Sequence, residues 1–201
     1  SITTKEFWET NNKLKTKGNV VWNGVENNDL SSSNEEIEKL RKQLFNATQN
    51  EVIITLVGRI SRLKGHKWLL STYLNHFKEY KNIKILFVGS PVEGQEYYLE
   101  EIEQIIANNN LVDVVKILPF TKNLLQVWSI TDIAVMPSTE PESFGLVAVE
   151  AMLAKKPLIG SNHGGLTEII VNNDKFQRCR SDNFFQNKVD RYEKFHGKKI
   201  F

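Results

Sequence analysis

Short runs of apolar residues alternate with amphipathic segments along most of the chain. Five runs are rich in β-branched residues and long enough to form buried strands; they cover residues 51–58, 83–89, 114–118, 132–138 and 157–162. Between and after these runs, apolar residues recur at helical spacing, which predicts helices over residues 66–80, 97–110, 123–131, 143–156 and 165–171. A charged helix over residues 34–44 comes before the first strand, and Ser33 or Asn34 could cap its first turn.

This alternation of strands and helices is typical of a parallel sheet that is covered by helices on both faces. We therefore expect an α/β fold, with a single Rossmann-like domain over residues 31–174. Residues 1–30 are predicted to be a connector, and residues 175–201 a basic C-terminal tail with a helical conformation. In sheets of this kind, ligands bind outside the carboxyl ends of the strands, so the loops after the strands are where a site is expected.

The composition is that of an ordinary globular protein, with 40% hydrophobic and 25% charged residues in 201. The single cysteine, Cys179, cannot form an internal disulfide, so the fold does not depend on an oxidising compartment. The polar N-terminal segment does not resemble a signal peptide, and no apolar run approaches the roughly 20 residues that span a bilayer. A cytoplasmic location is expected.

The charge is distributed unevenly. Residues 175–201 contain eight Lys or Arg against three acidic residues, a net charge of +5, which leaves −3 for the rest of the chain. A solvated helix or a frayed end is one interpretation of this tail; the other is a contact with nucleic acid or with acidic lipid, at the inner face of a membrane. Because the sequence carries no RNA-binding or DNA-binding motif, no nucleic-acid partner is expected.

The loop after the first strand, GRISRLKG, covers residues 58–65. Gly58 at the strand end allows another group to approach the backbone closely. Arg59 suits bidentate contact with phosphate oxygens, and Lys64 adds a second cation. The alternative is that both are solvated loop charges. The loop matches neither the Walker pattern nor the G-x-G-x-x-G dinucleotide pattern.

The loop after the fourth strand contains two glutamates, Glu142 and Glu150, that flank the predicted start of a helix at Ser143, Phe144 and Gly145. The first N–H groups of a helix and its positive dipole end are suited to a phosphate. Glu142 would face whatever lies over the helix start, or else cap it. Glu150 could accept hydrogen bonds from a diol such as a ribose; its apolar sequence neighbours argue against the alternative of a plain surface residue.

Together these motifs resemble those of the retaining glycosyltransferases of family 4. The resemblance spans roughly residues 20–170 and comprises VVWNGVE, VGRISRLKGHKWLL, ILFVGS, ILPFTKNLLQVWSITDIAVMPSTEPESFGLVAVEAM and PLIGSNHGGLTEII. It combines R-x4-K, E-x7-E and GG-x2-E patterns in this order. The family has the GT-B fold, in which two Rossmann-like domains face each other across a cleft. The resemblance implies that this chain is the C-terminal domain, which binds the nucleotide-sugar donor.

The resemblance also implies roles for individual residues. Arg59 and Lys64, with Gly58, would hold the donor diphosphate, and Glu150 would bind the ribose. Glu142 would be the catalytic residue beside the transferred sugar. Backbone groups complete the implied donor site, at Phe120 for the base and at Ser143, Phe144, Gly145 and Leu146 for the sugar and phosphate. The donor would be a UDP or GDP sugar, and no metal or other cofactor is expected, in keeping with the absence of an Asp-x-Asp motif.

Two departures from the family pattern limit these expectations. Residues 1–30 are too short to form the N-terminal, acceptor-binding domain, so the chain alone is expected to be inactive without that partner. The sequence after Glu168 lacks the family's usual turn, strand and helix. A stand-alone nucleotide-sugar-binding module and half of a sugar-nucleotide 2-epimerase remain alternatives. His163, beside the paired glycines, is not assigned a catalytic role, since the family tolerates several residue types there.

Overall fold

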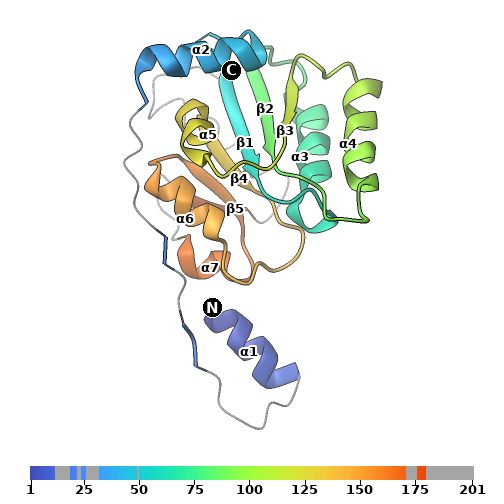
Figure 1. Cartoon of the computed structure of the whole chain (residues 1–201). Coiled ribbons are helices and arrows are strands. Elements are labelled where there is room, and N and C mark those ends of the chain that lie inside the picture. The colour runs from blue at the N-terminus through green and yellow to red at the C-terminus, as the bar shows by residue number, and fades with distance from the viewer. Residues whose placement is uncertain (12–18, 22–23, 26–31, 49, 171–175, 180–201) are drawn as a thin grey trace.

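The computed structural model describes residues 1–11, 19–21, 24–25, 32–48, 50–170 and 176–179 (Figure 1). Its strands are β1 (Val52–Val57), β2 (Ile83–Val88), β3 (Val115–Leu118), β4 (Ile133–Met136), β5 (Leu158–Ser161) and β6 (Phe176–Cys179). They form one sheet in the order β3-β2-β1-β4-β5-β6, and every neighbouring pair is parallel. The strand order reverses direction at β1 and β4, which is the arrangement of a Rossmann-like sheet.

The helices connect these strands. They are α1 (Ile2–Asn11), α2 (Asn34–Phe45), α3 (His66–Thr72), α4 (Tyr97–Asn108), α5 (Leu124–Ile130), α6 (Leu146–Leu153) and α7 (Leu166–Ile169). A short 3-10 turn, Arg62–Lys64, comes before α3, and a π-helical turn, Tyr73–Phe77, follows it. Ser33 caps α2 as expected, since its hydroxyl accepts from the Glu36 N–H while the Glu36 carboxylate accepts from the Ser33 N–H.

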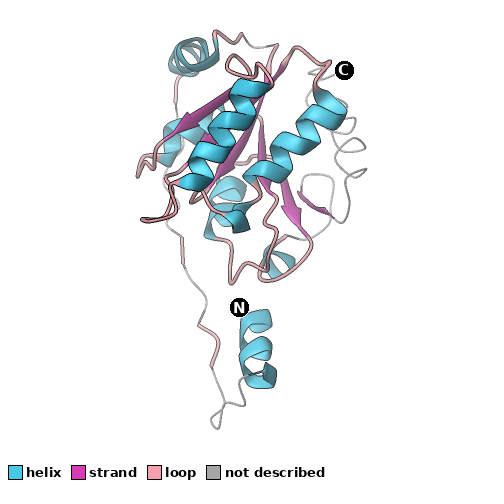
Figure 2. Cartoon of the chain, turned by 90° about the vertical axis from the view of Figure 1, so that its right-hand side faces the viewer, coloured by secondary structure: helices cyan, strands magenta, loops and turns pink. Residues whose placement is uncertain are grey.

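Both faces of the sheet are covered, because successive strand residues point to opposite sides. Val52, Ile54 and Leu56 of β1 pack against α3 and α4, whereas Ile53 packs with α2 and α5. Helices α6 and α7 pack against β4 and β5. Seen from the side in Figure 2, helices lie in front of the strands and behind them. The expected α/β fold, a parallel sheet between two layers of helices, is confirmed.

Three local differences from the sequence-based expectations concern the ends of the chain and one helix start. The predicted connector contains α1, a ten-residue helix. The predicted helical tail contains β6 at residues 176–179; residues 180–201 lie outside the described part, so their conformation stays a prediction. The helix expected from residue 143 begins only at Leu146, because Gly145 before it has a left-handed φ of 98°.

Candidate functional site

The carboxyl ends of the parallel strands gather three loops at one edge of the sheet. They are residues 58–65 after β1, residues 137–145 after β4 and residues 162–165 after β5. Because β1 and β4 are neighbours, and β4 and β5 are neighbours, these loops lie next to one another. The residues that the sequence assigned to phosphate and sugar binding all belong to them or to the start of α6.

The first two loops are joined by hydrogen bonds. The Thr139 N–H donates to the Leu63 carbonyl over 2.8 Å, and the Thr139 hydroxyl donates to the Arg62 carbonyl over 3.0 Å. Gly65, with φ of 77°, allows this contact, because a Cβ there would lie 2.0 Å from the Pro137 carbonyl oxygen. The backbone around Lys64 is therefore held against the end of β4.

Lys64 and Glu142 form an ion pair at the centre of the site. The Lys64 Nζ lies 2.6 Å from Glu142 Oε1, and the two side chains are only 21% and 16% exposed. The Ser138 hydroxyl donates to the same carboxylate oxygen over 2.6 Å. The residue assigned to the diphosphate and the residue assigned to the sugar are thus in direct contact, across 78 positions of sequence.

The loop after β5 fixes the backbone of Glu142. The Gly165 N–H donates to the Glu142 carbonyl over 2.6 Å, and Gly164 bridges to Glu142. A Cβ at Gly164 would lie 2.6 Å from both the N and the O of Glu142, and one at Gly165 would lie 2.7 Å from the Ser143 carbonyl oxygen. The paired glycines therefore permit a close approach of two backbones, which no larger residue would allow.

The other predicted cation has a different environment. Arg59 is exposed, and the described residues provide it with no ion-pair or hydrogen-bond partner. Gly58 continues β1, since its N–H donates to the Val88 carbonyl over 2.9 Å. Of the two predicted cations, Lys64 is therefore paired within the protein, whereas the Arg59 guanidinium faces solvent.

The start of α6 lies between the two glutamates. Ser143 is exposed, Phe144 is half-buried, Gly145 is buried, and Leu146, the first helical residue, is 42% exposed. The first N–H groups of a helix have no acceptor within it and carry the positive end of its dipole. These groups therefore begin at Leu146, three residues later than the sequence indicated.

Glu150 lies in the second turn of α6 and has an unsatisfied oxygen. Its Oε2 is buried and, within the described part of the chain, accepts no hydrogen bond. Burial raises the pKa of this carboxyl above its ordinary value. A ligand that donates hydrogen bonds would satisfy this oxygen.

Phe120 lies on the loop after β3, at the same edge but on the far side of β2. Its ring is 68% exposed, and its N–H donates to the Ser90 hydroxyl over 3.0 Å. With that N–H occupied, the carbonyl is the main-chain group at Phe120 that remains for a base.

A contact that the sequence did not predict joins α1 to this edge. The Glu168 carboxylate accepts from the N–H groups of Ile2 and Thr3, over 3.0 and 2.7 Å, and from the Thr3 hydroxyl, over 2.5 Å. The Thr4 hydroxyl donates to the Ser143 carbonyl over 3.1 Å. Burial raises the pKa of Glu168, but the hydrogen bonds from Thr3 and Ile2 outweigh it and lower this pKa to about 2. The GG-x2-E pattern includes Glu168, but it does not predict the contact of this residue with α1.

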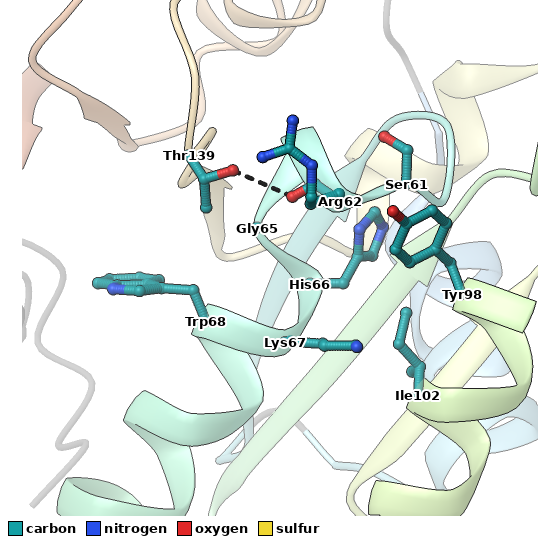
Figure 3. A pocket seen from close by; sticks show the side chains of 9 residues that line it. All are labelled: Ser61, Arg62, Gly65, His66, Lys67, Trp68, Tyr98, Ile102 and Thr139. Atoms are coloured by element: carbon teal, nitrogen blue, oxygen red, sulfur yellow. Dashed lines mark hydrogen bonds between the residues drawn. The ribbon is translucent and has the colours of Figure 1, made fainter.

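A small cavity lies behind the loop after β1, between the start of α3 and α4 (Figure 3). It measures about 80 Å³, well below the 300–1,000 Å³ that is usual for ligand sites, so it does not hold a nucleotide sugar. Of its lining residues, His66 is 1% exposed, and neither ring nitrogen has a hydrogen-bond partner in the described structure. Burial, and then the charge of Lys64, lower the pKa of His66 to about 4.

The described residues contain neither a metal-binding cluster nor a membrane-spanning helix. No group of three or more His, Cys, Asp or Glu there is arranged to hold a metal ion. None of the helices described is both long and apolar enough to cross a bilayer.

A Rossmann-like domain with cations, carboxylates and a helix start at the carboxyl edge of its sheet has the organisation of a nucleotide-binding domain. The family model for the glycosyl transferases group 1 matches residues 36–193. The chain belongs to this glycosyltransferase family.

Relatives of known name agree with this assignment. The chain is 28% identical over 151 residues to a D-inositol 3-phosphate glycosyltransferase of Corynebacterium kroppenstedtii, covering 73% of this chain and 33% of the relative. It is 32% identical over 164 residues to an uncharacterized glycosyltransferase of Methanocaldococcus jannaschii, covering 79% and 40%. The chain therefore spans between about a third and two fifths of the length of these curated relatives.

Solved structures show the same fold. Anabaena Alr3699/HepE, solved in complex with UDP and glucose, superposes with a TM-score of 0.78 at 28% identity, over 90% of this chain and 49% of its own. A glycosyltransferase of Rickettsia africae superposes with a TM-score of 0.82 at 24% identity, over 100% and 53%, which is a likeness of fold alone. The chain thus corresponds to about half of each of these structures.

Proposed function

We propose that this chain is the donor-binding half of a retaining glycosyltransferase, which transfers a hexose from a UDP or GDP sugar to a glycan or lipid acceptor. The observation that carries the proposal is the buried, unsatisfied Oε2 of Glu150. An unpartnered carboxylate oxygen in such a place is unfavourable, and the hydroxyl groups of a ribose are donors that would relieve it.

The remaining site residues extend this reading along the donor. Arg59 and Lys64 would bind the diphosphate together with the N–H groups at the start of α6. Glu142 would then lie beside the transferred sugar, since its carboxylate contacts Lys64 over 2.6 Å. With two cations and a helix start to stabilise the leaving diphosphate, the proposed reaction needs no divalent metal or other cofactor.

The acceptor side of the reaction is assigned to a partner. Because the chain covers about half of the solved structures that it resembles, we propose that a second Rossmann-like domain on the N-terminal side supplies the acceptor site. This chain alone would then bind the donor without transferring its sugar, because positioning of both reactants is lost. A cytoplasmic location at the inner face of a membrane, with residues 175–201 touching acidic lipid, belongs to the same proposal.

Calorimetric titration tests the donor site. In excess chelator, the chain should bind UDP or GDP, and Arg59→Ala should weaken this binding about tenfold or more, because a charge-assisted contact contributes about 1.5–3 kcal/mol. The matched control is Arg62→Ala, which removes a neighbouring exposed arginine whose partner is Glu140 and should leave affinity unchanged. Absence of binding for both nucleotides at millimolar concentration would refute the proposal.

The two glutamates should separate in the same experiment. Glu150→Gln should weaken the bare diphosphate and the sugar nucleotide alike, because the ribose is common to both. Glu142→Gln should not weaken diphosphate binding, since it removes the charge that partly neutralises Lys64, and it should reduce only the added affinity that the sugar provides. If both substitutions lowered the affinity for the bare diphosphate equally, the assignment of Glu142 to the sugar would be refuted.

A further inference from the structure

Ser138, the second residue after β4, connects three segments of the site. It is buried, with 3% of its surface exposed. Its hydroxyl donates to Glu142 Oε1 over 2.6 Å. Its carbonyl accepts from the Ser161 hydroxyl over 2.7 Å and from His163 Nε2 over 2.9 Å. The side chain of Ser138 therefore contacts the carboxylate of the site, and its carbonyl contacts β5 and the loop that follows it.

The hydrogen bonds define the orientation of the Glu142 carboxylate. Oε1 accepts both from Lys64 Nζ and from the Ser138 hydroxyl, each over 2.6 Å. Among the described residues, no donor contacts Oε2. Two donors on one oxygen fix the rotation of the carboxylate, so that the second oxygen is left for a ligand.

Lys64 and Ser138, the two hydrogen-bond donors to Oε1, differ in their roles when a sugar nucleotide binds. In the proposed function Lys64 also contacts the diphosphate, so its ammonium group interacts with both Glu142 and the ligand. Ser138 has no such second role, because it is buried and its single hydroxyl proton is directed at Oε1. The hydrogen bond from Ser138 to the Glu142 carboxylate is therefore the same with and without a bound nucleotide.

His163 contributes from the other side. A carbonyl oxygen only accepts hydrogen bonds, so Nε2 of His163 carries a proton in its contact with the Ser138 carbonyl. Its Nδ1 is buried and has no partner within the described structure. Neither nitrogen is thus placed to act as an external base, and the ring instead anchors Ser138.

We propose that Ser138 is a positioning residue for Glu142: it fixes the carboxylate so that Oε2 meets a hydroxyl of the transferred sugar. Ser161 and His163 support it through its carbonyl. This inference rests on the proposed function, in which Glu142 lies beside the sugar, and it adds three residues that do not touch the donor themselves.

The test compares affinities for UDP with UDP-glucose, and for GDP with GDP-mannose, using the pair that the wild-type chain binds. Ser138→Ala should leave the affinity for the diphosphate within about twofold and should reduce the additional affinity for the sugar nucleotide about tenfold, the size of one lost hydrogen bond to a charged group. Ser138→Thr, which retains the hydroxyl, should restore most of it. Ser129→Ala removes the hydroxyl of a half-buried serine that donates only within α5; it is the matched control and should behave as wild type.

A double substitution separates positioning from a general loss of structure. In a Glu142→Gln background, Ser138→Ala should have little further effect on sugar-nucleotide affinity, because the carboxylate that it positions is gone. Additive effects of the two substitutions, or equal losses of diphosphate and sugar-nucleotide affinity in folded Ser138→Ala, would overturn the inference.

Two other outcomes distinguish failure of the proposed function from failure of the role of Ser138. If the wild-type chain bound neither diphosphate, the donor site itself would be refuted. If the wild-type chain bound the sugar nucleotide more tightly than the diphosphate, and Ser138→Ala kept this additional affinity, only the role of Ser138 would be refuted. Ser161→Ala, which removes one anchor of the Ser138 carbonyl, should show the same pattern as Ser138→Ala to a smaller extent, and provides a second variant if Ser138→Ala does not fold.

Discussion

Replacing His66 by leucine should remove a specific part of the pH dependence of stability. The imidazole is 1% exposed, forms a T-shaped ring contact with Phe87 at a centroid distance of 5.0 Å, and has no hydrogen-bond partner for either nitrogen in the described structure. Burial, and then the charge of Lys64, lower its pKa from the ordinary 6.5 to about 4. The folded state therefore keeps His66 neutral at a pH where the unfolded chain binds a proton.

The sign and the size of the effect follow from linkage. Between pH 6.5 and 4 the unfolded state binds more protons at this position, so the free energy of unfolding falls as the pH falls. The full difference in pKa corresponds to about 3 kcal/mol. The stabilisation is complete above pH 6.5 and is lost progressively toward pH 4.

Urea unfolding followed by tryptophan fluorescence, at pH values from 7 to 4.5, measures this contribution. His66→Leu should flatten the dependence in this window and should be at least as stable as wild type at pH 4.5. His76→Gln, an exposed histidine of the neighbouring π-helical turn, should keep the wild-type slope. An unchanged slope in His66→Leu would show that the imidazole reaches solvent or a partner in solution.

Two further predictions concern the contact between α7 and α1 and the close approach of Gly164 to Glu142. Glu168→Gln should increase hydrogen exchange in residues 2–11. In wild type the same increase should appear as the pH falls below 4.5 toward 2, since the lowered pKa of Glu168 means that its contribution is present above 4.5 and lost on protonation. Gly164→Ala should lower the melting temperature much more than Gly94→Ala. Both glycines have left-handed φ values, of 62° and 76°, but only a Cβ at Gly164 would collide, 2.6 Å from the backbone of Glu142; equal losses would mean that backbone strain alone decides.

The parts of the fold that the sequence predicted are those with a strong local pattern. All five expected strands are present, each with ends within two residues of the predicted ones, because their apolar runs are buried on both faces of the sheet. The cap at Ser33 was predictable for the same reason, since the capping box involves residues only three positions apart.

The parts that were missed depend on contacts between distant segments. Helix α1 has no strong amphipathic pattern, and the contacts that hold its N-terminus come from Glu168, more than 160 positions away. The late start of α6 depends on the left-handed Gly145, whose position is fixed by packing on α7, where a Cβ would lie 2.6 Å from Leu166. No local pattern encodes either feature.

The candidate site illustrates the same division. Residue types and spacing identified Lys64, Glu142 and Glu150 singly, but an ion pair between the first two could not be inferred, since each lies in its own loop. Ser138 has no such signal, because a serine after a strand is common in turns, and only its distances to Glu142 and to the β5 loop distinguish it.

The ion pair also bears on how the proposed site would attract an anion. Part of the charge of Lys64 is already neutralised by Glu142 at 2.6 Å, whereas Arg59 is exposed and unpaired among the described residues. Long-range attraction of a diphosphate would therefore depend mainly on Arg59 and on the start of α6. Once a phosphate arrives, Lys64 is shared between it and Glu142, and the carboxylate keeps its place through the Ser138 hydroxyl. The same lysine then links the diphosphate to the carboxylate that would meet the sugar, so binding of the leaving group and positioning of the sugar become coupled at one side chain.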